Sequence, residues 1–348
     1  MNPSGYYLID ERLWLGLAAL IAATLPAGFA LTWLRSVVAA RLLAWAMALA
    51  ISAVVVFLSR DEPAGPRMFA VVFSLLWPIK AVVAVESQAA GQKRLRFWQY
   101  MAFAAAWPGM RPGIFTAFPG PPQPHVGRYA FKAAVRLAAG GALLALAAYL
   151  WRQESDRHLY YSPGAIEGAL SLTGRQILAT VLAMPALSLI LQFGCFTALV
   201  AFWRGLGVKT LSLFHAPFYS KSLQDFWGYR WNVAFTEMTT QAIVRPLRGR
   251  VGFPVAATAA FLFSGLLHEL AISVPVNAGY GLPTVYFVMH GGAMVFETLL
   301  RRTPYNVLAN PVLGRVWTAS WVIVPLPILF HQPFLRGCVW PLFRWAAV

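Results

Sequence analysis

Two ionisable residues interrupt an apolar run in FSGLLHEL, which covers residues 263–270. Ionisable side chains are costly at membrane depth, so His268 and Glu269 indicate a function there, with polar partners. A neutral imidazole at this position could act as a general base near physiological pH. Ser264 and Gly265 precede His268 by four and three residues, so a helix would leave a hydroxyl and open space beside the ring. A histidine that only hydrogen-bonds between helices is the alternative interpretation.

A second run, SLQDFWGYRWN at residues 222–232, holds charge, amide and aromatic rings close together. Ser222 followed by Asp225 predicts a capped helix start. On a regular helix, one stripe would carry hydrogen-bonding groups around a glycine that lets a ligand approach the backbone. Its members are Asp225, Gly228, Tyr229 and Asn232. The opposite stripe consists of Leu223, Phe226, Trp227, Arg230 and Trp231. This second stripe would suit the membrane surface, with Arg230 reaching headgroups or phosphate. An interfacial helix that its aromatic residues merely anchor is the alternative.

Motifs for several other chemistries are missing from the sequence. HELAI lacks the second histidine of the zinc-binding HExxH pattern, because Ile272 stands in its place. The chain has no GxSG run of an intramembrane serine protease and no DxxxD-type cluster for magnesium diphosphate. It also lacks Walker and GxGxxG phosphate loops. We therefore expect no metal and no bound cofactor.

The elements that position these residues are predicted to be membrane helices. Of the 348 residues, 59% are hydrophobic and 11% are charged, whereas soluble domains carry about 25% charged residues. Stretches of about 20 apolar residues suffice to cross a bilayer, and lipid leaves the backbone no partner outside a helix or a closed barrel. We predict an all-α, polytopic transmembrane fold with about eight spans: 13–34, 37–58, 68–86, 130–151, 177–201, 251–273, 283–300 and 316–335. Pro78 and Lys80 make the third span the weakest, and 97–107 is expected to form a further, interfacial helix.

The whole chain, 1–348, is expected to form one membrane-embedded domain whose motif-bearing core is roughly 202–300. The Pro- and Gly-rich run 107–125 cannot be a regular helix, so it is predicted to be a rigid loop that connects helices or shapes a pocket mouth. His290 lies seven residues before Glu297 on one helix face, where a packing or interhelical hydrogen bond is expected rather than catalysis.

The distribution of basic residues predicts the orientation. The net charge is +16, yet the hydrophobicity favours a cytoplasmic membrane face and anionic ligands over nucleic acid. Of the 28 basic residues, 19 fall on one side of the predicted spans, which the positive-inside rule makes cytoplasmic. Both termini then face outward, and the run at 222–232 lies in the longest cytoplasmic stretch. The Ala- and Arg-rich composition indicates a bacterial inner membrane.

Together the two runs resemble the wax synthase branch of the membrane-bound O-acyltransferase superfamily. SLQDFWGYRWN is close to that branch's SLQDFWGRRWN-type signature, and FSGLLHEL matches its SGxxHE-type signature. WPGM at 107–110 is similar to bacterial members, and the spacing of Asn232 and His268 fits the superfamily. Tyr229 stands where many relatives have Arg, which would alter the acceptor or headgroup contact.

The resemblance implies a membrane enzyme that moves an acyl group from a thioester, typically acyl-CoA, to a hydroxyl. His268 would match the catalytic histidine and Asn232 its companion polar residue, the two converging on one tunnel in which an apolar interior holds the acyl chain. The other motif residues are expected to bind substrate: Asp225, Trp227, Gly228, Tyr229, Arg230, Ser264, Gly265 and Glu269. Basic residues near the cytoplasmic mouth would attract the CoA phosphates, although topology alone also demands them: Arg204, Lys209, Lys221, Arg230, Arg245, Arg248 and Arg250.

The expected partners are acyl-CoA, a lipophilic alcohol and membrane lipids, with no nucleic acid. A sterol, a secondary metabolite or a cell-envelope sugar is the alternative acceptor for the same chemistry. A transporter or lipid-binding membrane protein, in which His268 and Asn232 line a passage, is the alternative of a different class.

Overall fold

A computed structural model describes residues 5–155 and 172–345, and these residues form helices and connecting loops without any strand. The first half contains α1 Glu11–Leu31, α2 Val37–Leu58, α3 Ala64–Ala89, α4 Phe97–Ala106, α5 Val126–Ser155, α6 Gly174–Leu187 and α7 Phe196–Gly205. The second half contains α8 Leu223–Asp225, α9 Val233–Thr239, α10 Arg245–Val251, α11 Phe253–His268, α12 Val274–Val276, α13 Leu282–Leu300, α14 Pro311–Ile323, α15 Leu326–Leu329, α16 Gln332–Phe334 and α17 Leu342–Trp345.

Wider π-helical turns join several of these helices without a break. They are Ser188–Cys195 between α6 and α7, Phe226–Arg230 after α8, Thr240–Val244 between α9 and α10, Glu269–Ser273 between α11 and α12, and Leu335–Val339 after α16. Short 3-10 turns occupy Pro112–Phe115, Pro217–Tyr219 and Val307–Ala309. The expected all-α fold is confirmed, and π turns of this kind often occur at functional sites.

Seven segments of the described chain are long and apolar enough to cross a membrane: Glu11–Leu31, Val37–Leu58, Ala64–Ala89, Val126–Gln153, Gly174–Gly205, Val255–Val276 and Pro311–Leu329. The protein is therefore an integral, multi-pass membrane protein. The remaining predicted span, 283–300, does form the helix α13, but it is not among the seven. Its buried His290 and Glu297 explain this, because they lower the hydropathy of the helix.

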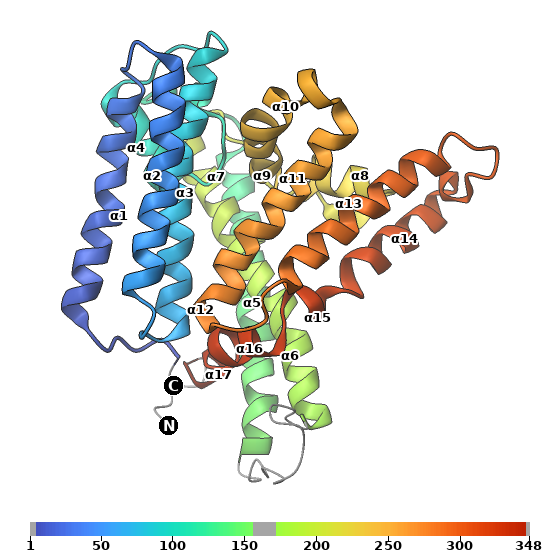
Figure 1. Ribbon diagram of the computed structural model, residues 1–348. Coiled ribbons are helices and arrows are strands. Elements are labelled where there is room, and N and C mark those ends of the chain that lie inside the picture. Colours follow the sequence, from blue (N-terminus) through green and yellow to red (C-terminus); the bar gives the residue numbers. More distant parts are fainter. Residues whose placement is uncertain (1–4, 156–171, 346–348) are drawn as a thin grey trace.

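Helix α3, predicted as the weakest span, is the most enclosed one. Within its most apolar window 67% of the residues are buried inside the protein, against 22–28% for the other six segments. It packs between α1 and α2 on one side and the π turn Glu269–Ser273 on the other (Figure 1). Pro78 and Lys80 are thus accommodated by protein contacts instead of lipid.

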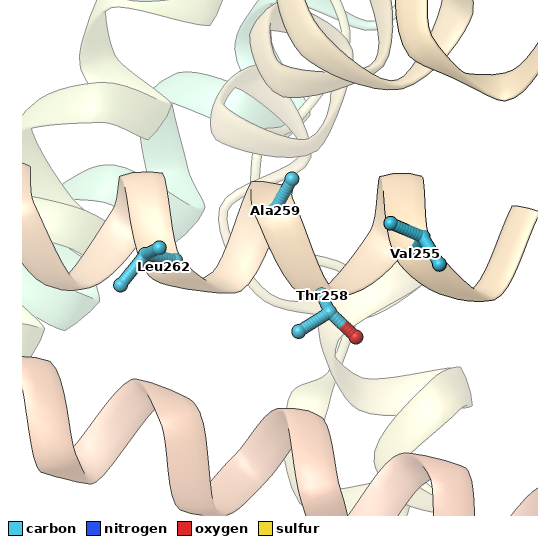
Figure 2. A pocket seen from close by; sticks show the side chains of 4 residues that line it. All are labelled: Val255, Thr258, Ala259 and Leu262. Carbon is cyan, nitrogen blue, oxygen red and sulfur yellow. The ribbon is translucent and has the colours of Figure 1, made fainter. Parts of the chain in front are cut away.

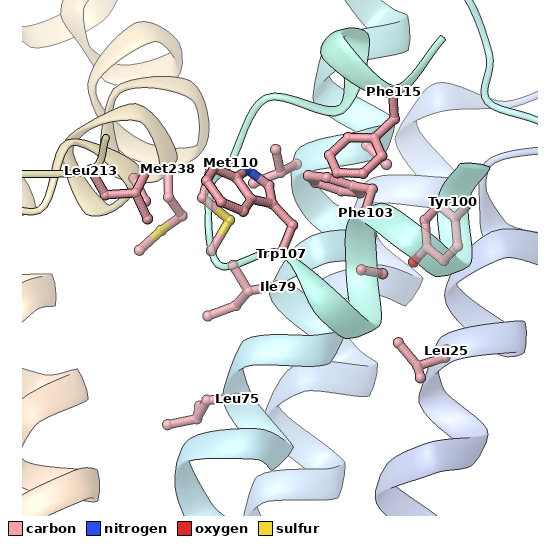
Figure 3. Packing of buried hydrophobic residues seen from close by; sticks show 14 of the residues in the cluster. Leu25, Leu75, Ile79, Tyr100, Phe103, Trp107, Met110, Phe115, Leu213 and Met238 are labelled. Atoms are coloured by element: carbon pink, nitrogen blue, oxygen red, sulfur yellow. The ribbon is translucent and has the colours of Figure 1, made fainter. Parts of the chain in front are cut away.

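The region 97–107 forms α4, as expected for a helix there. Its aromatic side chains pack with the loop that follows and with α7, and Figure 3 shows Phe103, Trp107 and Phe115 in this cluster. The rings of Phe103 and Phe115 lie 5.9 Å apart, and those of Phe115 and Trp203 lie 5.1 Å apart. The run 107–125 is a loop with one 3-10 turn, in agreement with its proline content.

The described ends of the chain, before α1 and at α17, lie at the same end of the helices in Figure 1. The Tyr6 hydroxyl donates to the Cys338 carbonyl oxygen at 2.6 Å, which joins the described ends of the chain. At the opposite end lie α10 and the start of α11. Helices α11 and α13 pack closely where Gly265 meets Thr284, because a Cβ on Gly265 would lie 2.8 Å from the Thr284 Cα.

Candidate functional site

His268 is the last residue of α11, immediately before the π turn Glu269–Ser273. Its Nδ1 lies 2.7 Å from the Ser264 carbonyl oxygen. Since a carbonyl can only accept, Nδ1 carries the proton and Nε2 is left as an acceptor. Among the described residues Nε2 has no hydrogen-bond partner. The contact that the structure shows is with the Ser264 backbone carbonyl, and the expected place of the Ser264 hydroxyl beside the ring stays a prediction.

Two phenylalanines from different helices flank the partly buried imidazole. The ring of Phe287, on α13, lies 4.3 Å from that of His268 between centroids, and the ring of Phe235, on α9, lies 6.2 Å away. The open nitrogen therefore belongs to a ring held between apolar walls at the junction of α9, α11 and α13. The imidazole is shielded from bulk water on these sides.

Asn232 caps the start of α9 from a left-handed backbone conformation, with φ +44°. Its Oδ1 accepts the Phe235 N–H at 3.3 Å, whereas its Nδ2 has no hydrogen-bond partner in the part of the chain that the structure describes. Phe235 thus contacts both predicted catalytic residues, one through its backbone and the other through its ring. The structure brings Asn232 and His268 to the same region of the protein.

The run 222–232 is not one regular helix, so the predicted stripes are wrong. Ser222 does cap the start, accepting the Asp225 N–H at 3.0 Å. The chain then widens, because the Trp231 N–H donates to the Phe226 carbonyl oxygen five residues back at 2.8 Å. Asn232 follows this π turn as the cap of the next helix and therefore does not share a helix face with Asp225.

The predicted membrane-surface stripe lies largely inside the protein. Leu223 is fully buried, Phe226 is 6% exposed, and the Phe226 ring stacks on Trp231 at 5.3 Å. Arg230 pairs with Asp225 at 2.8 Å and also donates to the carbonyl oxygens of the 215–216 turn. Arg230 therefore has internal partners, and its predicted contact with headgroups or phosphate stays a prediction.

Tyr229 is 68% exposed and has no described contact with the site. Gly228 has no heavy atom within 4 Å of the position a Cβ would take, so its backbone is open, as expected for ligand approach. Both residues remain predictions as substrate contacts.

Trp227 projects into the interior between the helices that carry the site. Its ring lies 5.7 Å from Phe287, 6.2 Å from Phe261 and 5.3 Å from His290. The His290 Nδ1 hydrogen-bonds the Tyr286 carbonyl oxygen at 2.7 Å, which agrees with the packing role predicted for this histidine. The Trp227 Nε1 and the His290 Nε2 are both buried without a hydrogen-bond partner among the described residues.

Glu269 points away from this cluster, toward the start of α13. Its Oε1 accepts the Thr284 N–H at 3.0 Å and the Thr284 hydroxyl at 2.9 Å, while its Oε2 is buried without a partner in the described chain. The open space predicted at Gly265 is taken by Thr284, so Gly265 permits helix packing there. The carboxylate and the glycine together fix α11 against α13.

An apolar cavity of about 340 Å³ lies between α2, α3 and the His268-bearing helix. Its walls are Trp45, Ala48, Leu49, Leu75, Ile79, Phe263, Leu266, Leu267, Glu269 and Leu270. The size falls within the range of pockets that bind small molecules or cofactors. Two of its walls, Leu267 and Glu269, are the chain neighbours of His268.

A second, more open groove of about 380 Å³ runs along the outer side of α11. Figure 2 shows its lining residues, Val255, Thr258, Ala259 and Leu262, on one side of that helix. Neither Asn232 nor His268 lines it. The cavity between α2, α3 and α11 is less open than this groove, and the chain neighbours of His268, Leu267 and Glu269, line it.

The residues around Lys80 were not predicted to contribute to the site. Lys80 is fully buried, its Nζ donates to the Trp107 and Gly109 carbonyl oxygens at 2.6 Å each, and it lies over the Phe103 ring at 4.4 Å. The only sequence signals were an ionisable residue inside a span and the WPGM run at 107–110. These hydrogen bonds attach the backbone at 107 and 109 to α3, and the rigidity of the loop stays a prediction.

The same loop also binds α9, the helix that Asn232 caps. Arg111 pairs with Glu237 at 2.6 Å, and the Gln241 side-chain amide donates to the Met110 carbonyl oxygen at 3.3 Å. Burial raises the pKa of the Glu237 carboxyl above its ordinary value, and the Arg111 charge offsets part of this rise. The loop after α4 thus ties α3 to the Asn232-bearing helix.

Comparison with known proteins identifies the same region of the chain. Residues 210–289, which include Asn232 and His268, match the membrane bound O-acyl transferase family. The chain is 32% identical over 192 residues to probable long-chain-alcohol O-fatty-acyltransferase 6 of Arabidopsis thaliana, an alignment that covers 49% of this chain and 55% of the relative. It is 31% identical over 142 residues to the long-chain-alcohol O-fatty-acyltransferase of Simmondsia chinensis, covering 38% and 40% respectively.

The chain thus spans about half the length of the curated relatives it matches. The shared part contains both motif runs and the helices that present His268 and Asn232. This helical membrane chain is therefore similar, over residues 210–289, to the membrane bound O-acyl transferase family and, over about half of its length, to plant long-chain-alcohol O-fatty-acyltransferases.

Proposed function

We propose that the protein transfers a fatty acyl group from acyl-CoA to the hydroxyl of a lipophilic alcohol. The observation that carries this proposal is the His268 imidazole, whose Nδ1 is held by the Ser264 carbonyl while Nε2 stays open beside the Asn232-capped helix. The names of the relatives, long-chain-alcohol O-fatty-acyltransferases, support the same reaction class.

The proposed reaction begins when His268 Nε2 takes the proton of the alcohol O–H. The alcohol oxygen attacks the thioester carbonyl carbon, a C–O bond forms, and negative charge develops on the carbonyl oxygen. When the C–S bond breaks, the imidazolium gives this proton to the leaving thiolate, so the neutral imidazole is regenerated. The products are an ester and free CoA.

Asn232 has an unpaired amide group available for this chemistry. Because its Oδ1 is used in the cap of α9, the Nδ2 hydrogens are the part that can donate to the carbonyl oxygen or orient a substrate. A single donor to a developing oxyanion contributes about 10²–10³-fold in rate. We assign Asn232 this donor role, without need of a metal or bound cofactor.

The apolar cavity of about 340 Å³ beside Leu267 and Glu269 is proposed to hold the acyl chain. The CoA phosphates need positive charge near the end of the protein that holds the Asn232 segment. Arg204 is buried against backbone carbonyls and Arg230 is paired with Asp225, so neither is well suited. The exposed Arg245, Arg248 and Arg250 of α10 are better candidates.

A long-chain alcohol is the proposed acceptor, and a sterol, secondary metabolite or cell-envelope sugar is the alternative. A bacterial inner membrane remains the proposed location on composition alone, with the end that bears α10 facing the cytoplasm. The named relatives compared here are from plants.

The test uses purified protein, labelled acyl-CoA and a panel of alcohols. The wild type is expected to form ester, and His268→Ala is expected to lose about 10²–10⁴-fold in turnover, as for loss of a general base. His331→Asn is the matched control, since His331 is also buried but binds Ser273 and the Phe334 N–H instead of lying beside Asn232. Unchanged turnover in folded His268→Ala would remove His268 as the base. A wild type that moves alcohols across vesicles without forming ester would favour the transporter alternative.

A further inference from the structure

Glu297 is a buried carboxylate on α13 that takes no part in the proposed chemistry. It is 2% exposed, and its oxygens accept the Leu223 N–H at 2.8 Å, the Gln224 N–H at 3.5 Å and the Trp317 indole N–H at 2.9 Å. Leu223 and Gln224 are the first two residues of the helical turn that opens the 222–232 run. A buried charge with this many donors is well satisfied and strongly oriented.

These hydrogen bonds complete the start of the motif run. The first backbone N–H groups of a helix have no partner within it. Ser222 serves the third and fourth of them, through its hydroxyl to Asp225 and its carbonyl to Phe226. Glu297 serves the first two, and its negative charge is favourable at a helix N-terminus. The start of the run is thus fixed by a residue from another helix.

Helix α13 also contacts the catalytic end of the site. Phe287 lies against His268 at 4.3 Å and against Trp227 at 5.7 Å, and His290 lies against Trp227 at 5.3 Å. Glu297 follows Phe287 by ten residues, or about 15 Å of helix. One rigid element therefore holds His268 near one end and the beginning of the 222–232 run near the other.

We propose that Glu297 is a positioning residue for acyl transfer. Its carboxylate fixes the start of the 222–232 run on α13 and so sets where Asn232, at the end of that run, lies relative to His268. Arg301, one helical turn later, adds a hydrogen bond to the Gln224 side chain at 3.0 Å. This role rests on the proposed function, and it assigns Glu297 no contact with substrate.

The chain contains a matched control for a purely structural role. Glu62 is 8% exposed and binds the same set of donors: the Ile9 N–H at 3.0 Å, the Asp10 N–H at 2.9 Å and the Trp14 indole N–H at 2.9 Å. It holds the beginning of α1, away from both motif runs. Removing either carboxylate leaves two backbone N–H groups and one indole N–H unpaired, and removing Glu297 also ends its ion pair with Arg301 at 3.8 Å.

The experiment compares Glu297→Ala and Glu297→Gln with Glu62→Ala and Glu62→Gln in the purified full chain. Hydrogen exchange of 222–232, melting temperature, kcat and KM are measured for each. Both Ala variants should lower the melting temperature, but only Glu297→Ala should speed exchange in 222–232 and lower kcat by about 10- to 100-fold, the cost of a small misplacement. Glu297→Gln keeps one acceptor oxygen, so its exchange rate and kcat should lie between those of the wild type and Glu297→Ala. This variant keeps the test possible if Glu297→Ala does not fold.

Two results would overturn the role of Glu297. One is equal kcat, per folded molecule, in the Glu297 and Glu62 variants. The other is unchanged hydrogen exchange of 222–232 in both Glu297 variants. A wild type that forms no ester would instead overturn the proposed function, and with it the catalytic part of this proposal, whatever the exchange data show. The wild-type control thus separates the two failures.

Discussion

Phe235 and His268 lie with their rings 6.2 Å apart, on helices α9 and α11. The backbone N–H of the same phenylalanine donates to Asn232 Oδ1. One residue therefore connects the two side chains that the sequence motifs single out. This arrangement places Asn232 and His268 in the same region of the protein, and it separates two features of Asn232, the helix cap and the unpaired Nδ2.

Substitutions of Asn232 should separate these two roles. Asn232→Asp keeps an acceptor for the Phe235 N–H but loses the Nδ2 donor, so we expect near-normal stability and a kcat lowered by about 10²-fold. Asn232→Ala removes the cap and places Ala at φ +44°, which should cost about 1–2 kcal/mol of stability from the cap and about 1–2 kcal/mol from the left-handed backbone.

Asn232→Gly is the control for backbone strain, because glycine adopts the left-handed conformation readily. It should be more stable than Asn232→Ala and as inactive as Asn232→Asp. Melting temperatures check the expected ranking of the Asn232 variants in stability, and steady-state kcat checks their ranking in activity. Full activity in both Asn232→Asp and Asn232→Gly would show that the amide donor has no part in catalysis.

The sequence predicted the type of fold for a clear physical reason, whereas the convergence of the two motif runs followed only from the family resemblance. Apolar length and the need to satisfy backbone groups in lipid leave helices as the expected elements. The run 222–232 was harder, because a period of 3.6 residues places Asn232 on the same face as Asp225. The hydrogen bond from Trp231 to Phe226 widens the turn, and single-sequence periodicity contains no sign of it.

Partners distant in the sequence account for the other differences. The charge of Lys80 made α3 look like a poor membrane span. Its two acceptors, the carbonyl oxygens at 107 and 109, belong to the loop after the next helix, so local sequence does not show that the charge is satisfied. In the same way, Gly265 looked like space for a substrate because nothing in the sequence places Thr284 against it. Hydropathy and local spacing cannot show which residue fills a gap between helices.

The two motif glycines should respond differently to an added methyl group. In Gly265→Ala the Cβ would lie 2.8 Å from the Thr284 Cα, so α11 must move from α13. We expect a loss of about 1–3 kcal/mol, as for overpacking elsewhere. Because Glu269 binds Thr284 at this contact, turnover should fall as well.

Gly228→Ala is the matched control for that substitution, since no heavy atom lies within 4 Å of its added Cβ. Its stability should stay within about 0.5 kcal/mol of the wild type, as for surface substitutions. Melting temperatures of the two variants check the difference. Equal melting temperatures for Gly265→Ala and wild type would contradict the close packing of α11 and α13.

Lys80→Met should destabilise the protein despite replacing a buried charge with an apolar chain. The substitution leaves the Trp107 and Gly109 carbonyl oxygens without their donor, at a cost of about 1–3 kcal/mol each. Lys93→Met, at an exposed position in the same part of the chain, is the control and should change stability by less than about 0.5 kcal/mol. Thermal unfolding in detergent measures both variants. A Lys80→Met protein as stable as the wild type would show that the loop holds its shape without the lysine.

The raised pKa of Glu237 predicts a pH dependence of stability. Burial is the largest cause of the rise, and the nearby Arg111 charge opposes it without cancelling it. Between the ordinary glutamate pKa of about 4.3 and the higher folded value, the folded protein binds more protons than the unfolded chain. The contribution of Glu237 to stability is therefore fully present below the lower value and is lost as the pH rises through the folded pKa.

Glu237→Gln has no proton to lose, so its stability should lack this component. As the pH rises above about 4.3, the unfolding free energy of the wild type should fall relative to that of Glu237→Gln. The difference should become constant above the folded pKa of Glu237. Arg111→Met should move that change to higher pH, because the Arg111 charge lowers the pKa of Glu237. Unfolding measured from pH 4 to 8 in one detergent checks all three proteins. A difference that moves in the opposite direction would mean that the ion pair with Arg111 outweighs burial, and that Glu237 holds α9 to the 107–111 loop mainly as a charge.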